Sequence, residues 1–425
     1  MRYSLPAELK TQILQHIIAQ QPSSLAQYAT VCRVWQDIIE PILFAEVTLY
    51  VTSTSILSRG TTASTLDKYI SGPRKRELKN LRLVIDFDPL DFPNIPVGAF
   101  SPRLEFKARF VDIIDSFVDT LSKWKDMSFD LEIIEMNSSS RLLLHRGSNL
   151  LQQPKKLIEC VRSIKHLEFN AERCHIRCSH GGFLSLLCSR MSDNLTELHY
   201  GFDQKNPDLA ELYEDTCSFV PKSVKSLTIR NLDQRACLRL RVDLGAKMAL
   251  DRVSMQLEAL HVSHYVDAQA LFSTFSSGNS ISPLAWPNLR RLSITLYEFR
   301  YFNFPDRSQD PLLWTACAAL EMPRLQRLDV WFPKINHRHG RYFRYWIEGG
   351  RAHVLWDMGF RAGMRQYLFN AWDAVARFHT SRPLDTDIRT MNSAEAGDED
   401  PLQASLSFFE PYVPSMEQLR RAQVT

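Results

Sequence analysis

Apolar residues near the start of the chain recur every three or four positions, which is the spacing of one face of an α-helix. In residues 5–20 this stripe consists of Leu9, Ile13, Leu14, Ile17 and Ile18. Pro6 stands near the first helical position, where its missing N–H has no cost. Pro22 disfavours helical geometry in the residue before it. The pattern therefore predicts one helix that ends before Pro22.

A second apolar stripe follows with the same spacing. Ser23 or Ser24 can cap its helix, and its apolar residues are Leu25, Tyr28, Ala29, Cys32 and Trp35. The Glu40-Pro41 step predicts a break before residues 42–50, which fit a short helical turn that runs into a strand. Three short helices bury little surface, so this region needs a partner or the rest of the chain.

A different pattern, apolar-x-x-Leu-x-apolar, is repeated through the rest of the chain. Its last two apolar positions lie two apart, as in a strand that buries one face. The copies begin at Leu78, Ile164, Leu195, Val224, Leu257, Leu289 and Leu325. A weaker copy occupies residues 124–133, and from Leu167 onward the central leucines are 31, 29, 33, 32 and 36 residues apart.

Helical patterns lie between these predicted strands, at residues 110–124, 183–191, 208–220, 268–275 and 311–320. A strand and a helix repeated at a nearly constant spacing are typical of a stacked solenoid, with the strands on the concave face. In a doubly wound sheet the strands would be more continuously apolar. No glycine-rich phosphate loop follows any strand. We therefore predict a mixed α/β protein with a solenoid array.

The N-terminal residues resemble an F-box, the helical motif by which substrate receptors join cullin-RING ubiquitin ligases. The motif is Leu-Pro-x-Glu, a spaced aliphatic pair and Val-Cys-x-x-Trp, and residues 1–50 contain its parts in order. The resemblance implies that residues 4–47 bind a Skp-type linker protein. The residues implied to make or support this contact are Leu5, Pro6, Glu8, Ile13, Ile17, Val31, Cys32 and Trp35; Leu25, Tyr28 and Phe44 complete the match.

Two other interpretations of this region have to be weighed. One is an ordinary helical hairpin that covers the next domain. The other is a DNA-binding helix-turn-helix, whose recognition helix needs exposed Arg, Asn or Gln. The third helix instead contains Trp35, Ile38 and Ile39, which argues against DNA binding.

Residues 51–335 resemble an irregular leucine-rich-repeat array, although the asparagine that such repeats place after the strand is missing. The resemblance implies that the array holds a target protein. Residues between the last two apolar positions of each repeat point away from the core side chains. The substrate-binding candidates at this position are His199, Thr228, His261, Ser293 and Asp329.

Composition narrows the class of protein further. The 425 residues carry a formal net charge of only +3, which argues against a dedicated nucleic-acid binder. No apolar run approaches the roughly 18 residues of a membrane helix. The eight cysteines form no dense disulfide framework. The charged residues in the apolar segment 31–44, and the helical pattern before it, argue against a secretory leader. We expect a cytoplasmic or nuclear location, or both, with reduced thiols.

Residues with metal-binding chemistry occur in the sequence CHIRCSH. Cys174, His175, Cys178 and His180 could bind zinc in a tetrahedral site. A structural zinc site usually needs a second pair of ligands, and none stands out. We expect a loop here with a buried Cys188, and no metal or cofactor. Common catalytic and phosphate-binding motifs are missing from the sequence, although a catalytic pair formed only in space remains an alternative.

Arginines and aromatic residues alternate over residues 341–360. Such a segment can stack on bases, anchor a protein partner, or close the open end of a solenoid. We favour a helical cap over residues 336–380, with its last amphipathic helix at 366–378. Residues 381–425 are predicted to form a disordered acidic tail, with a docking segment at 406–421.

Together these features predict a non-catalytic adaptor. The resemblance implies a substrate-recognition subunit of an SCF-type cullin-RING E3 ubiquitin ligase. Its F-box would bind the linker and cullin, and its array would bind an unknown protein substrate. An F-box scaffold acting outside a ligase is the alternative. An enzyme with its site on the concave face is a third hypothesis.

Overall fold

The computed structural model describes part of the chain. The described residues are 6–20, 25–52, 66–72, 74–87, 115–124, 127–137, 164–171, 188, 194–202, 220–231, 253, 255–263, 271–272, 286–296, 310–332, 341–357 and 364–385. The chain divides into two compact units, residues 1–265 and 266–425. Each unit is described by itself below.

The first unit begins with three helices, α1 (Ala7–Gln20), α2 (Leu25–Tyr28) and α3 (Arg33–Ala45). Each contributes one fully buried residue to a small common core: Leu14, Leu25 and Ile39. We call residues 6–45 the N-terminal module. The predicted end of the first helix before Pro22 is confirmed, since α1 stops at Gln20.

The break predicted at Glu40-Pro41 is wrong, because α3 continues through Pro41 to Ala45. Proline removes one helical hydrogen bond, but Ile39 and Leu43 on either side of it pack into the core of the module, which holds the helix together. The chain breaks earlier, in a turn after α2 where the Val31 N–H donates to the Tyr28 carbonyl.

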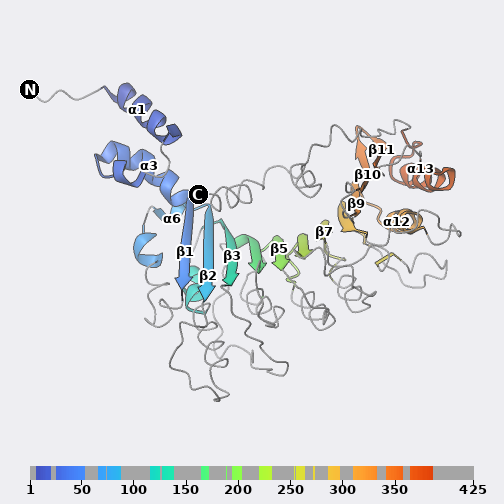
Figure 1. The fold of residues 1–425 in the computed structure, drawn as a ribbon, viewed down its shortest axis with the longest axis horizontal. Helices are drawn as coiled ribbons and strands as arrows, with labels where there is room; N and C mark the ends of the chain where they lie inside the picture. The colour runs from blue at the N-terminus through green and yellow to red at the C-terminus, as the bar shows by residue number, and fades with distance from the viewer. Residues whose placement is uncertain are drawn as a thin grey trace, which may run out of the picture. The chain divides into compact units, whose positions relative to one another are not determined.

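Seven parallel strands follow in the first unit: β1 (Glu46–Thr52), β2 (Asn80–Phe87), β3 (Phe129–Asn137), β4 (Ile164–Ala171), β5 (Glu197–Phe202), β6 (Ser226–Asn231) and β7 (Ala259–Ser263). Each strand pairs with the next one along the chain. Figure 1 shows them side by side with their arrowheads at one edge. Every strand predicted from the repeat in this unit is confirmed.

The repeated leucines explain this order. Leu81, Leu131, Leu167, Leu198, Leu227 and Leu260 are register partners across neighbouring strands, and each is at most 1% exposed. A second apolar row two residues later is equally buried: Leu83, Ile133, Phe169, Tyr200, Ile229 and Val262. Burial of one such side chain stabilises by roughly 1.5–3 kcal/mol, so the repeat sets the register of the strands.

Contacts attach the N-terminal module to the strands. Helix α3 leads directly into β1, and α6 (Arg74–Glu77) packs beside α3. The guanidinium of Arg74 donates to both carboxylate oxygens of Glu40, at 2.6 and 3.3 Å. The same guanidinium lies 4.7 Å from the ring centre of Phe44. The hydrogen bond from Arg74 is the main cause that lowers the pKa of Glu40, so this pair keeps its charge near neutral pH.

The second unit contains β8 (Arg291–Thr295), α12 (Pro311–Leu320), β9 (Arg327–Phe332), β10 (Arg341–Glu348), β11 (Arg351–Asp357) and α13 (Gln366–Thr380). Strands β8 and β9 are parallel, whereas β10 is antiparallel to both β9 and β11. The predicted strands at 289–294 and 325–330 and the predicted helices at 311–320 and 366–378 are confirmed.

The helical cap predicted over residues 336–380 is wrong for its first part, because β10 and β11 form a hairpin. Gly349 and Gly350 make the turn with φ of 56° and 73°, angles that favour glycine and suit a two-residue hairpin turn. Helix α13 packs against this hairpin. Its Trp372 is fully buried, with ring centres 4.7 Å from Phe343 and 5.3 Å from Tyr345.

Several predictions fall on residues outside the described part of the chain. They include the helix at 208–220, most of the helices at 183–191 and 268–275, and the tail beyond residue 385. Residues 115–122 are helical, as predicted. Within the described residues, every helix is too short or too polar to cross a membrane.

We expect the second unit to lose stability in acid because of His379. Its Nε2 donates to the Met322 carbonyl and its Nδ1 accepts from the Tyr345 hydroxyl, both at 3.0 Å. Burial lowers the pKa of His379 below its usual value. The unfolded chain then binds a proton first as pH falls below about 6.5. In urea unfolding, the contribution of His379 to the free energy of unfolding should be complete above this pH. At lower pH it should decrease, by at most about 1.4 kcal/mol per pH unit.

The control for this prediction is His379→Gln, which cannot titrate. Other histidines contribute equally to both proteins, so the difference between them isolates His379. The variant should show a shallower loss of unfolding free energy between pH 7.5 and 5.5. Equal pH dependence of the two proteins would contradict the assignment.

Candidate functional site

A row of polar side chains crosses the sheet of the first unit, on the face opposite the leucines. Strand residues alternate between the two faces, so the residue after each central leucine lies on this second face. The members are register partners on neighbouring strands and are all half-buried. We call this set the polar row: Arg82, Glu132, Glu168, His199, Thr228 and His261.

The polar row brings together three of the five predicted substrate-binding residues, His199, Thr228 and His261. Arg82, Glu132 and Glu168 were not among the predicted site residues, although they stand at the same position of their repeats. The repeat pattern alone could therefore have identified these three residues. Within the row, Arg82 donates to the Glu132 carboxylate at 2.5 Å, so opposite charges neutralise each other on β2 and β3.

The other two predicted residues, Ser293 and Asp329, lie in the second unit and are not surface residues. They are register partners on β8 and β9, but Ser293 is 2% exposed and Asp329 is 1% exposed. Arg327 and Arg344 donate their Nε–H groups to the two carboxylate oxygens of Asp329, at 2.8 and 2.7 Å. The prediction that these two positions point outward to an open surface is wrong, because both side chains are buried. The two arginines bind Asp329, and the Trp331 Nε1–H donates to the Ser293 hydroxyl oxygen at 3.2 Å.

A second set of polar residues flanks the row on strands β3 to β5. Asp130, His166 and Glu197 are register partners, and the Nδ1 of His166 lies 3.1 Å from a Glu197 oxygen. Burial opposes the charged imidazole, but the hydrogen bond to Glu197 and the nearby carboxylates outweigh it and raise the pKa of His166. The same hydrogen bond is the main cause that lowers the pKa of Glu197.

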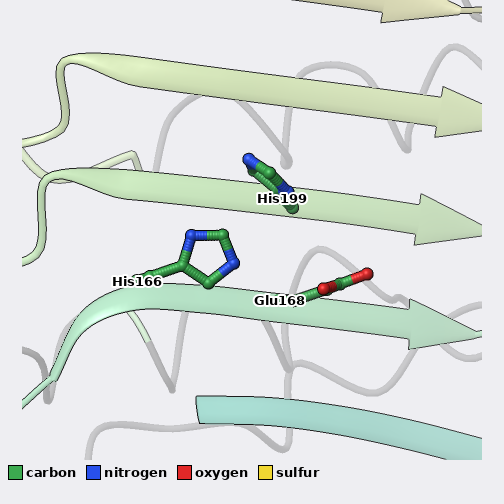
Figure 2. A group of neighbouring side chains, drawn as sticks. All are labelled: His166, Glu168 and His199. Atoms are coloured by element: carbon green, nitrogen blue, oxygen red, sulfur yellow. The ribbon is translucent and has the colours of Figure 1, made fainter. Parts of the chain in front are cut away.

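His166 also contacts the polar row. Its ring centre lies 4.5 Å from that of His199, and the two rings meet edge to face. Burial, and then the neighbouring His166, lower the pKa of His199 to about 3, so His199 is a neutral imidazole at physiological pH. The ligand atoms of His166, Glu168 and His199 all lie within 4.8 Å of one another. Figure 2 shows the three side chains as neighbours on two adjacent strands.

The predicted linker-binding residues occupy two kinds of position in the N-terminal module. Pro6, Ile13, Val31 and Cys32 are exposed. Ile17 and Trp35 are partly buried against the core of the module, and the ring of Trp35 lies 6.1 Å from that of Tyr28. Glu8 is in the first turn of α1, and Leu5 lies outside the described residues.

Apolar exposure is pronounced in the same region. Ile13 is 40% exposed and Val31 is 61% exposed. Leu9 and Val34, which sequence analysis did not assign to the interface, are 45% and 50% exposed. We call Leu9, Ile13, Val31 and Val34 the exposed apolar set.

The zinc ligands weighed in the sequence, Cys174 to His180, lie outside the described residues. Cys188 is described, and its predicted burial is confirmed. Burial raises the pKa of its thiol to about 12, so this cysteine is protonated and is a poor metal ligand.

A comparison with protein-family models gives a match to part of the chain. Residues 206–401, which are less than half of the chain, match a family of unknown function (DUF6546). No curated protein matches the chain.

Proposed function

We propose that this protein is the substrate-recognition subunit of an SCF-type cullin-RING E3 ubiquitin ligase. The observation that carries the proposal is the exposed apolar set on the N-terminal module, which includes Ile13 and Val31 at the positions of the F-box motif. In this proposal residues 1–50 form the F-box and residues 51–335 form an irregular leucine-rich-repeat solenoid.

The exposed apolar set favours a protein partner for the module, because a partner would bury these side chains. Single exposed apolar residues are normal on protein surfaces, but this small module exposes four large ones within 26 residues, which favours an interaction site. Covering one such side chain stabilises a complex by roughly 1.5–3 kcal/mol. A Skp-type linker that covers the exposed apolar set supplies this burial.

Motif residues then take different roles. Ile13 and Val31 contact the linker directly, and Pro6 and Cys32, which are also exposed in the module, add to this contact. Ile17 and Trp35 support the surface from below, since they pack against Leu14, Leu25 and Ile39. Leu5 and Glu8 keep the linker-binding role that the resemblance implies.

The polar row supplies the surface for the target protein. Its acidic, basic and imidazole groups are half-buried and held at strand spacing, which suits recognition of a polar segment. The chain contributes no reacting group in this picture. It raises the effective concentration of a target lysine near the ubiquitin-loaded enzyme.

A scaffold that binds the linker without a ligase is the second candidate. The exposed apolar set favours linker binding equally in both cases. Capture of the cullin separates them, since a scaffold outside the ligase does not retain it.

Charges placed in the exposed apolar set should abolish linker binding. We expect Ile13→Asp combined with Val31→Asp to weaken capture of a purified Skp-type linker by at least about 100-fold, because each buried carboxylate lacks a partner. Both positions are exposed in the free chain, so the fold and its circular dichroism should not change. Titration of labelled linker with wild type and variant measures the affinity.

Phe378→Asp is the matched control, since Phe378 is a large apolar residue that is 52% exposed in the second unit. It should bind the linker like the wild type. An unchanged affinity for the linker in the variant with Ile13→Asp and Val31→Asp would contradict the proposed interface. Trp35→Ala is a poor test, because loss of this side chain also disturbs the core of the module.

A further inference from the structure

We propose that His166, Glu168 and His199 form a binding site for a divalent transition-metal ion, for which Zn²⁺ is the probe. This differs from the expectation of no metal and does not depend on the proposed ligase function. The motif weighed for zinc in the sequence, Cys174 to His180, is not part of it. The site arises where strands β4 and β5 pair.

Strand geometry brings the three ligands together. Glu168 and His199 are register partners on adjacent parallel strands, which lie about 4.8 Å apart in any sheet. His166 and Glu168 are two residues apart on β4, so their side chains project from the same face. The result is a triangle of one carboxylate and two imidazoles with ligand atoms within 4.8 Å of one another.

Small side-chain movements convert this triangle into a coordination shell. Ligand atoms about 2.0–2.2 Å from a tetrahedral zinc ion stand roughly 3.3–3.5 Å from each other. Rotation about side-chain bonds closes the remaining distance without a change in the backbone. Figure 2 shows the imidazole of His166 and the carboxylate of Glu168 on β4 with His199 beside them on β5.

Glu197 orients the first ligand. Its carboxylate accepts from Nδ1 of His166 at 3.1 Å, which directs Nε2 of the same ring to the metal. A carboxylate on the second nitrogen of a metal-binding histidine is the usual arrangement around protein metal ions, since it fixes the ring and increases its basicity.

The local charge also favours a cation. The carboxylates of Asp130, Glu168 and Glu197 all act on His166, whereas the positive charge of Arg82 is taken up by Glu132. A divalent ion added at the triangle balances this excess of negative charge.

The ligand set defines the class of ion. Two imidazoles and one carboxylate suit zinc and similar first-row ions rather than calcium or magnesium, which prefer oxygen ligands. Three protein ligands leave a fourth position for water or for a side chain of a bound partner. Because Glu168 and His199 also belong to the polar row, this position faces the side of the sheet that the row occupies.

The test is Zn²⁺ binding to the full chain after removal of metal with a chelator. Competition with a zinc-sensitive dye should show one Zn²⁺ ion bound per chain, and this binding should weaken when a residue of the triangle is replaced. X-ray absorption of the bound zinc should show nitrogen or oxygen neighbours at about 2.0–2.2 Å and no sulfur at about 2.3 Å. His199→Ala and Glu168→Gln should each weaken binding by at least about 100-fold, and Glu197→Gln by about 10–100-fold.

His261→Ala is the matched control, because it removes a histidine of the polar row outside the triangle. It should keep the wild-type zinc affinity. Circular dichroism of each variant establishes that the fold persists, and Glu168→Gln replaces His199→Ala if the latter unfolds. Sulfur in the zinc shell, no bound equivalent, or equal affinity in wild type and Glu168→Gln would each overturn the proposal.

Discussion

Replacing Asp329 by alanine is expected to lower the free energy of unfolding of the second unit by about 3–5 kcal/mol. The carboxylate is 1% exposed and accepts one hydrogen bond from Arg327 and one from Arg344. Their side chains are themselves 22% and 13% exposed. Removal of Asp329 takes a shared, buried acceptor away from two poorly hydrated guanidinium groups on neighbouring strands. Breaking a buried ion pair from one side in this way costs more than the intact pair contributes to stability.

Hydrogen exchange of the β9 and β10 amides measures this effect locally, because it reports the free energy of opening for each strand. The matched control is Arg377→Ala, which removes an ion pair with Asp373 on α13 whose arginine is 61% exposed. An exposed helical pair of this kind contributes only about 0.3–0.5 kcal/mol. Equal losses for Asp329→Ala and Arg377→Ala would contradict the structural role of Asp329.

Replacing Trp372 by alanine should have a similarly large effect, about 3–5 kcal/mol. The indole is fully buried and packs between α13 and β10 against Phe343 and Tyr345. Alanine leaves a cavity that the hairpin cannot fill without moving. The loss should appear as earlier unfolding in urea and as faster exchange of the α13 and β10 amides.

Phe378→Ala provides the control on the same helix. Phe378 is 52% exposed, and surface substitutions usually change stability by no more than about 0.5 kcal/mol. The comparison separates loss of packing from any effect on the helix itself, since both variants gain alanine. A Trp372→Ala protein as stable as Phe378→Ala would show that α13 does not hold the hairpin.

The strands were predictable because burial repeats along the chain. The central leucines, Leu167, Leu198 and Leu227 among them, stand at nearly constant spacing and become register partners. Each strand therefore carries its own signal, and its position does not depend on distant contacts. The same regularity placed His199, Thr228 and His261 in one row.

The errors come from positions where packing overrides local preference. Pro41 normally ends a helix, but Ile39 and Leu43 hold α3 in place through the core. The Gly349-Gly350 pair indicates a hairpin turn, but the prediction for this segment was based on its alternating arginines and aromatic residues. Ser293 and Asp329 fit the spacing of surface residues, yet β10 runs antiparallel to β9 and brings Arg344 to Asp329.

The triangle of His166, Glu168 and His199 could not be predicted in the same way. Glu168 and His199 are 31 residues apart, and their meeting depends on the register of two strands. A shift of one residue would place His199 on the opposite face. Sequence supplies the residue types, while pairing of the strands supplies the distances.

Co-purification of the full chain with a Skp-type linker and a cullin tests the proposed function most directly. We predict stable capture of both proteins by the wild type and of neither by the variant that carries Ile13→Asp and Val31→Asp. Capture of the linker without the cullin would support the scaffold instead of the ligase subunit. A folded wild-type chain that captures neither protein would contradict the proposal.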